Sequence, residues 1–93
     1  MRFEWDEEKN GVNKEKHHIS FEAAVDVFYD PYRLDDYDDK HSIDEERRIV
    51  IGKAGKILYV VYTERGTDVI RLISARPATK KERMMYYGDH YYD

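Results

Sequence analysis

The chain has 93 residues, of which 39% are charged and 14% aromatic, and it contains no cysteine. This length predicts one domain with a single hydrophobic core over residues 1–93. We expect no membrane span and no secretory signal, because no long apolar run and no basic leader are present. The lack of cysteine excludes disulfides and thiolate metal sites, and fits a cytoplasmic protein.

The net charge of −4 is distributed unevenly along the chain. Residues 1–46 carry 6 Lys/Arg and 15 Asp/Glu, a balance of −9, whereas residues 47–93 carry 10 and 5, a balance of +5. Such asymmetry is compatible with a polyanion-binding surface in the second half. Two ordinary solvated faces would give the same numbers, so charge alone leaves both readings open.

Two helices are predicted in the first third of the chain. Residues 1–4 are either a first strand or a simple lead-in. Asp6 is a good N-cap, so a first helix should begin there and run to about Lys16 or His17. Ser20 should cap a second helix that ends before the Asp30-Pro31 pair, because a residue that precedes proline is pushed out of the α region. Its core stripe would be Phe21, Ala24, Val25 and Phe28.

The middle of the chain predicts a mostly antiparallel sheet. An edge strand is expected at 32–37, followed by an acidic loop that reaches residue 46. Three apolar strands should follow, and their glycine-bearing connections (52–55 and 65–67) are short enough to make a three-stranded meander. We place these strands at 47–52, 57–63 and 69–75.

A third helix is predicted after Pro77, because Thr79 and Glu82 have the spacing of a capping box. The tyrosine-rich tail, residues 86–93, is either frayed or docked. Helices followed by strands, without alternation, indicate an α+β fold.

Motifs for metals and cofactors are missing. The histidines have no zinc-site spacing, and the acidic stretch at 35–46 lacks the glycine turn and terminal glutamate of a calcium loop. No phosphate-binding glycine motif occurs. We therefore expect no metal and no cofactor, and interpret the acidic stretch as a solvated loop.

Cations and one amide form the remaining candidate site. Lys9, Asn13 and Lys16 would lie within about 60° of one another on the first helix, an arrangement that suits a phosphate backbone or simply a solvated face. Arginines on or beside the strands could clamp phosphates, because the guanidinium fork binds two oxygens, or could form salt bridges with the many carboxylates. These are Arg47, Arg65, Arg71 and Arg76.

Such a set can cleave RNA without a metal. His17 or a carboxylate could move the proton of the attacking 2′-hydroxyl, and arginines could balance the charge that develops on phosphorus. DNA lacks this hydroxyl, so the chemistry would be specific to RNA. A non-catalytic protein-binding module fits the composition equally well.

Three separated blocks of sequence resemble the BrnT family of toxins. The first runs from Phe3-Glu4-Trp5-Asp6 through Lys9 and Asn13 to Lys16-His17-His18-Ile19-Ser20-Phe21-Glu22. The second comprises Asp39-Lys40-His41-Ser42, Glu45-Glu46-Arg47 and Ile51-Gly52. The third comprises Tyr62-Thr63-Glu64-Arg65, Arg71-Leu72-Ile73-Ser74-Ala75-Arg76-Pro77-Ala78 and Glu82-Arg83.

The resemblance implies a fold similar to the RelE/ParE toxins and a ribonuclease activity. It also implies neutralisation by a BrnA-type antitoxin, whose ribbon-helix-helix domain would make any DNA contact indirect for this chain. The implied catalytic residues are His17 as acid or base, Arg47, Arg65 and Arg76 as phosphate clamps, Tyr62 as a stacking or proton-donating group, and Lys16. Lys9, Asn13 and Arg71 would bind RNA. One departure is His18, where the family usually has glycine.

Overall fold

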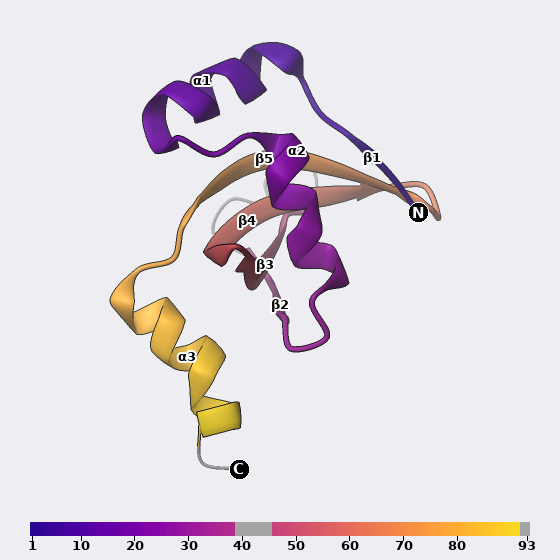
Figure 1. The fold of residues 1–93 in the computed structure, drawn as a ribbon. Coiled ribbons are helices and arrows are strands. Elements are labelled where there is room, and N and C mark those ends of the chain that lie inside the picture. Colours follow the sequence, from indigo (N-terminus) through magenta and orange to yellow (C-terminus); the bar gives the residue numbers. More distant parts are fainter. Residues whose placement is uncertain (39–45, 92–93) are drawn as a thin grey trace.

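The structure, a computed structural model, describes residues 1–38 and 46–91. A five-stranded sheet with the order β1-β5-β4-β3-β2 forms its centre (Figure 1). The second helical segment covers one face of the sheet and the last helix lies against the other. The elements in chain order are β1 (Arg2–Glu4), α1 (Glu7–His17), α2 (Phe21–Ala24), η1 (Val25–Tyr29), β2 (Leu34–Tyr37), β3 (Arg48–Ala54), β4 (Lys56–Arg65), β5 (Val69–Pro77) and α3 (Lys80–Tyr91).

The sheet is mixed, because its first strand is parallel to its last. β1 pairs with β5 in the register Arg2↔Val69 to Glu4↔Arg71, while every other neighbouring pair is antiparallel. The predicted meander and edge strand are therefore present, but the sheet gains a fifth strand that the sequence left open. Phe3 anchors this strand, since its ring lies 5.3 Å from that of Phe28.

The predicted second helix is α-helical only in its first half. Ser20 caps it as expected, accepting a hydrogen bond from the backbone N–H of Ala23, but from Val25 onward the chain forms a 3₁₀ helix. The tighter winding replaces Val25 with Val27 in the buried stripe, because three residues complete a turn. The stripe is thus Phe21, Ala24, Val27 and Phe28.

The 3₁₀ helix η1 lies in close contact with β3. A Cβ at Gly52 would lie 3.0 Å from both the Cβ and the carbonyl oxygen of Val27. Gly52 therefore belongs inside β3, where it lets η1 approach the sheet, and not in the predicted turn. The turn itself is at Gly55, whose φ of +79° favours glycine.

A β-bulge interrupts the pairing of β4 with β5. Val61 is opposite Ser74 and Tyr62 is opposite Leu72, so Ile73 is the extra residue. Leu72 and Ala75 consequently both enter the core under α2 and η1, although three positions separate them. Arg76 is thereby directed to the opposite face, where it is the cross-strand neighbour of Tyr59.

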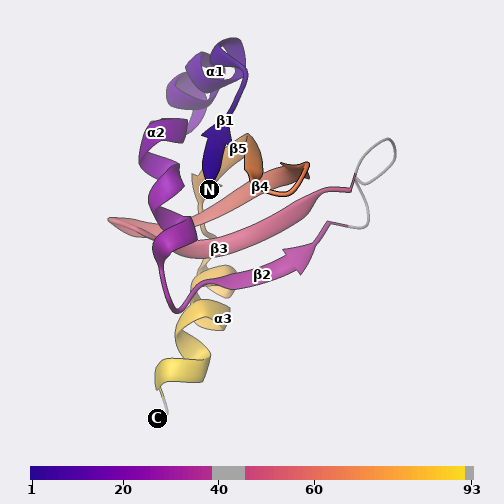
Figure 2. The ribbon, with the colours of Figure 1, turned by 90° about the vertical axis from the view of Figure 1, so that its right-hand side faces the viewer.

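The last helix begins with the predicted capping box. The backbone N–H of Thr79 donates to Glu82 Oε1 at 2.8 Å, and that of Glu82 donates to Thr79 Oγ1 at 3.2 Å. The tail is helical to Tyr91, and Tyr86 is docked: it is buried and its hydroxyl donates to Asp30 Oδ2. Figure 2 shows α3 extending below the sheet.

Most of the predicted acidic loop, residues 39–45, lies outside the described residues, as do residues 92–93. No helix in the described part of the chain is long and apolar enough to cross a membrane. Among the side chains that the structure describes, in residues 1–38 and 46–88, no three His, Asp or Glu are grouped so that they could hold a metal ion.

Candidate functional site

Helix α1 carries the first part of the candidate site at its C-terminal end. Asp6 caps its N-terminus by accepting hydrogen bonds from the backbone N–H groups of Glu8 and Lys9, at 2.8 and 3.2 Å. The helix ends after His17, as predicted, because His18 adopts a left-handed conformation with φ of 60°. Its last turn thus places Lys16 and His17 next to each other, where cations are favoured by the helix dipole.

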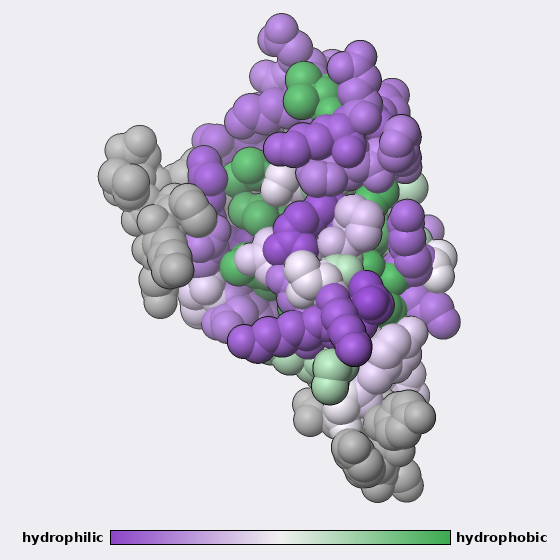
Figure 3. All heavy atoms as spheres, turned by 90° about the vertical axis from the view of Figure 1, so that its left-hand side faces the viewer, coloured by the Kyte–Doolittle hydropathy of each residue, from purple (hydrophilic) through white to green (hydrophobic). Residues whose placement is uncertain are grey.

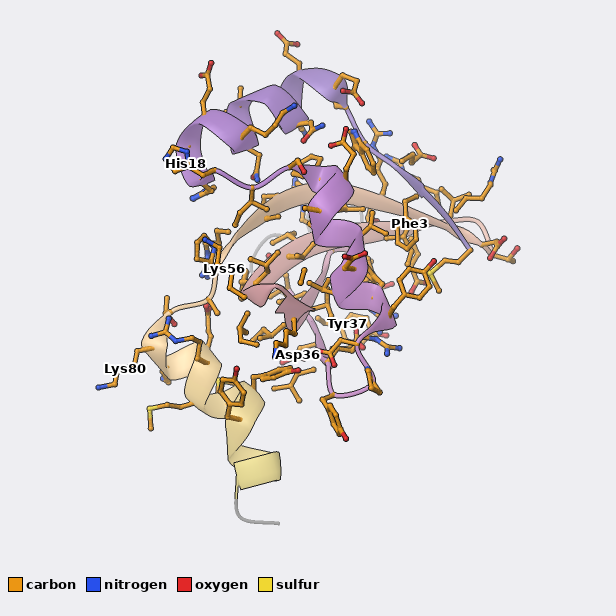
Figure 4. The ribbon with its side chains drawn as sticks, in the orientation of Figure 1. Phe3, His18, Asp36, Tyr37, Lys56 and Lys80 are labelled. Atoms are coloured by element: carbon orange, nitrogen blue, oxygen red, sulfur yellow. The ribbon has the colours of Figure 1, made fainter. Side chains whose placement is uncertain are left out.

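The backbone at His18 explains why glycine suits this position. A left-handed residue normally costs about 1–2 kcal/mol when it has a Cβ, although histidine tolerates it better than most residues. We expect His18→Gly to raise the free energy of unfolding by about 1 kcal/mol, after allowance for the greater flexibility of glycine in the unfolded chain. Urea denaturation would measure it, and an unchanged or lower midpoint would contradict the assignment of strain to this residue. Figure 4 shows His18 at the end of α1.

Two buried asparagines fix α1 against the rest of the protein. The Asn13 amide donates to the carbonyl oxygens of Ile19 and Ala75, at 2.8 and 2.7 Å, and accepts from the backbone N–H of Ala75 at 3.1 Å. Asn10 donates to Glu22 Oε1 and accepts from the backbone N–H of Phe21. α1 is therefore bound to β5 beyond the point where β1 ends.

This placement corrects the interpretation of Asn13. Its side chain is 6% exposed and both amide N–H groups donate to backbone carbonyls, so it has no donor left for RNA. We therefore remove Asn13 from the predicted RNA contacts. The sequence did not single out Asn10, which also attaches α1 to the rest of the protein. Its position three residues before Asn13, on the same helix face, could have indicated this.

A groove separates α1 from the outer part of β5. Its lining includes Lys9, Lys16 and His17 from the helix, and Ile73 and Ser74 from the bulged strand. The groove has a volume of about 440 Å³ and also carries Asp6, Glu8, Val12 and Asn13 in its lining. The surface in Figure 3 is largely hydrophilic, with hydrophobic side chains visible between the charged ones.

The electrostatics of this groove favour a neutral imidazole. Partial burial lowers the pKa of His17 below its ordinary value of 6.5, and the positive charges of Lys16 and Arg76 lower it further. His17 is therefore mostly unprotonated at neutral pH and can accept a proton. Arg76, 59 positions away in sequence, thus contributes to the electrostatics at the end of α1, although it does not line the groove.

Arg76 is held in one orientation by its neighbours. Its Nη1 and Nη2 atoms donate to Glu82 Oε1 and Oε2 at 2.8 and 2.9 Å, and Nη1 also donates to the carbonyl oxygen of Pro77 at 3.2 Å. The guanidinium carbon lies 3.9 Å from the ring centroid of Tyr59. Sequence analysis missed Tyr59 and Glu82. The capping box had pointed to Glu82 only as a helix signal.

The other predicted catalytic residues lie at the far end of the sheet. Tyr62 is 3% exposed, packs against Phe28 with a centroid distance of 4.9 Å, and donates its hydroxyl to Asp35 at 3.0 Å. Burial raises the pKa of Tyr62 well above its ordinary value of 10. This ring is part of the core, so the prediction of a stacking or proton-donating Tyr62 is corrected to a structural role.

The other three predicted arginines lie outside the groove. Arg47 is half-buried just before β3, and Arg65 is exposed at the end of β4, about 20 Å along the strand from Tyr59. Arg71 forms an ion pair with Glu4, the salt-bridge alternative that the sequence had left open. The structure thus brings Lys9, Lys16 and His17 together in one groove and places Arg76 outside its lining, near enough to influence His17 electrostatically. Arg47, Tyr62 and Arg65 lie apart from this group.

One further arginine escaped the sequence analysis. Arg48 donates to Glu64 at 3.0 Å, and its guanidinium lies over the Tyr37 ring at 4.9 Å from the centroid. It borders a hollow at this end of the sheet together with Tyr37, Thr63, Glu64 and Arg65. No motif marks Arg48, and only its pairing opposite Tyr62 in the sheet reveals these contacts.

Comparison with known proteins places the chain in a family. A family model described as "Ribonuclease toxin, BrnT, of type II toxin-antitoxin system" matches residues 5–82. Among solved structures, the ribonuclease toxin BrnT of Brucella abortus aligns with a TM-score of 0.65 and 24% sequence identity, over 86% of this chain and 99% of that one. A search of curated proteins found no match. This chain belongs to the BrnT family of ribonuclease toxins from type II toxin–antitoxin systems.

Proposed function

We propose that this toxin cleaves RNA without a metal, in the groove between α1 and β5. The observation that carries the proposal is that Lys16 and His17 lie side by side in the lining of this groove, with Arg76 near enough for its charge to lower the pKa of His17. An acid or base and two cations are the groups that attack by a 2′-hydroxyl on the neighbouring phosphate requires. The reaction yields a 2′,3′-cyclic phosphate and a free 5′-hydroxyl, and spares DNA, which lacks the nucleophile.

His17 serves as the general base in this scheme. Its lowered pKa keeps the imidazole neutral, so it can take the proton of the 2′-hydroxyl as the oxygen attacks phosphorus. Lys16 and Arg76 then face the phosphorane, whose additional negative charge they stabilise. The departing 5′-oxygen takes a proton from water and leaves as the free 5′-hydroxyl, so the scheme balances without a second protein acid.

RNA on either side of the cleaved bond would contact cations outside this centre. Lys9 lines the same groove about two helical turns before Lys16. Arg47 and Arg65 lie at the other end of the sheet and are assigned to more distant phosphates. A fold akin to the RelE/ParE toxins, which the resemblance implies, and a cytoplasmic site of action, which the lack of cysteine favours, stay predictions.

The partner that we propose is a BrnA-type antitoxin with a ribbon-helix-helix domain. The family assignment implies an antitoxin protein. DNA contact by this toxin would then be indirect, through that partner. An alternative function, a catalytically inactive protein-binding module, is favoured by one observation: α3 exposes Met84, Met85 and Tyr87, residue types enriched at protein interfaces.

Expression in bacteria with Arg76→Ala distinguishes the two functions. Wild-type toxin should arrest growth and fragment RNA, and the variant should do neither while still binding the antitoxin, because α3 and the sheet remain folded. Lys81→Ala, which removes an exposed cation from α3, is the matched control and should stay toxic. Purified wild-type toxin should keep its cleavage rate in EDTA. Normal growth and intact RNA with wild-type toxin would favour the binding module.

A further inference from the structure

Glu82 contacts Arg76 through both of its carboxylate oxygens. Hydrogen bonds from Arg76 are the largest cause that lowers the pKa of Glu82, so the carboxylate stays charged at neutral pH. Its side chain is 17% exposed and that of Arg76 is 33% exposed, so the pair is only partly screened by water. Such a bidentate pair fixes the direction of the guanidinium as well as its charge.

The hydrogen bonds leave one defined edge of Arg76 for a ligand. A guanidinium has five N–H donors. Nη1 uses both of its donors, on Glu82 and on the carbonyl of Pro77, and Nη2 uses one on Glu82. The remaining donors are Nε–H and the second Nη2–H. No residue in the described part of the chain accepts from Nε–H, and these two donors lie parallel on the same edge, the arrangement that binds two oxygens of a phosphate.

Tyr59 fixes the plane of the Arg76 guanidinium. Its ring lies under the guanidinium, 3.9 Å from the guanidinium carbon to the ring centroid, and this contact sets the plane of the group. Glu82 prevents rotation within that plane. The carboxylate also caps α3 through the backbone N–H of Thr79, so the start of the helix and the direction of Arg76 depend on one side chain.

We infer that Glu82 is a positioning residue, which turns the Nε–Nη2 edge of Arg76 toward the scissile phosphate. This inference rests on the proposed ribonuclease function. It makes α3 a necessary part of the site although the helix itself contributes no group to the reaction. Loss of Glu82 should leave RNA binding by the other cations in place but allow Arg76 to rotate away from the phosphorane.

Kinetics with a fluorogenic oligoribonucleotide test the inference. Glu82→Gln should lower kcat about 10- to 100-fold, the effect of a small displacement of a catalytic group, and change KM by less than twofold. The matched control is Thr79→Ala, which removes the other half of the capping box and leaves the Arg76–Glu82 contacts intact. It should keep the wild-type kcat at a temperature where both variants are folded. Equal kcat for wild-type and Glu82→Gln protein would overturn the inference.

A binding measurement separates this inference from the proposed function. A 2′-O-methyl oligoribonucleotide cannot be cleaved, and it should shift the Nε–H resonance of Arg76 in ¹⁵N-resolved NMR spectra of wild-type and Thr79→Ala protein. In Glu82→Gln protein the shift should be lost although the oligonucleotide still binds. If wild-type toxin shows this shift but cleaves no RNA, the proposed catalysis fails, and Glu82 orients Arg76 toward a bound phosphate that is not cleaved. If the oligonucleotide leaves the resonance unmoved in wild-type protein, the positioning role fails.

Discussion

Replacing His17 with alanine is expected to lower kcat for RNA cleavage by about 10²- to 10⁴-fold, the usual contribution of a general base. KM should change little, because the phosphate contacts proposed for Lys9, Lys16 and Arg76 would remain. The imidazole is only partly buried, at the C-terminal end of α1, so its removal should cost little stability. Single-turnover cleavage of an oligoribonucleotide measures the chemical step directly.

The pH dependence of the cleavage rate shows whether His17 acts as a general base or as a general acid. A general base acts when it is neutral, and burial together with nearby cations lowers the pKa of His17 below 6.5. The rate should therefore rise with pH up to a midpoint below 6.5 and stay level through neutral pH. A rate that falls as pH increases through this midpoint would instead make His17 the general acid.

His18→Gly is the matched control for the adjacent position. It retains His17 and the helix end, so its kcat should stay within about twofold of wild type, with a rate–pH profile of the same shape. A similar loss of kcat in both variants would mean that the helix end, and not the imidazole, is what catalysis requires.

Replacing Asn13 with alanine is expected to lower the free energy of unfolding by about 3 kcal/mol. The substitution leaves the N–H and carbonyl of Ala75 and the carbonyl of Ile19 without their partner, and Ala75 is fully buried. An unsatisfied buried polar group costs about 1–3 kcal/mol, and part of this loss would be recovered by water that enters next to the helix. Chemical denaturation monitored by Trp5 fluorescence measures the change.

Two companion variants define the cause of this loss. Asn13→Asp has nearly the same shape but replaces both donors with a carboxylate oxygen that faces two carbonyl oxygens, so it should be at least as destabilising. Glu15→Ala changes an exposed position of the same helix and should alter stability by no more than about 0.5 kcal/mol. A loss under about 1 kcal/mol for Asn13→Ala would show that the amide is not essential to the attachment of α1.

The features that were predicted correctly from the sequence are local ones. Asp6, Ser20 and the Thr79–Glu82 capping box each mark the start of a helix, because their side chains bond backbone groups two or three residues away. The three strands of the meander follow from apolar runs separated by short turns. Lys16 and His17 were found together because adjacent residues at a helix end stay adjacent in any fold.

The sequence did not reveal features that depend on contacts between distant segments. Asn13 lies in a polar helix whose sequence is typical of a solvated face. It is buried only because the edge of β5 beyond β1 offers it backbone partners. The family resemblance implied a catalytic Tyr62, but α2 and η1 cover its face of the sheet. The second helix changed to 3₁₀ where it meets Gly52, a contact between segments about 25 residues apart.

The position of Arg76 separates most clearly what the sequence determines from what the tertiary structure determines. The sequence by itself determined that an arginine lies directly after the predicted last strand, within a block that resembles the family. Strict alternation from Leu72 would have put Arg76 on the face under α2 and η1. The bulge at Ile73 adds one residue and reverses the facing of those that follow, so the guanidinium meets Tyr59 and Glu82 instead. A bulge depends on how two strands pair, which only the tertiary structure decides.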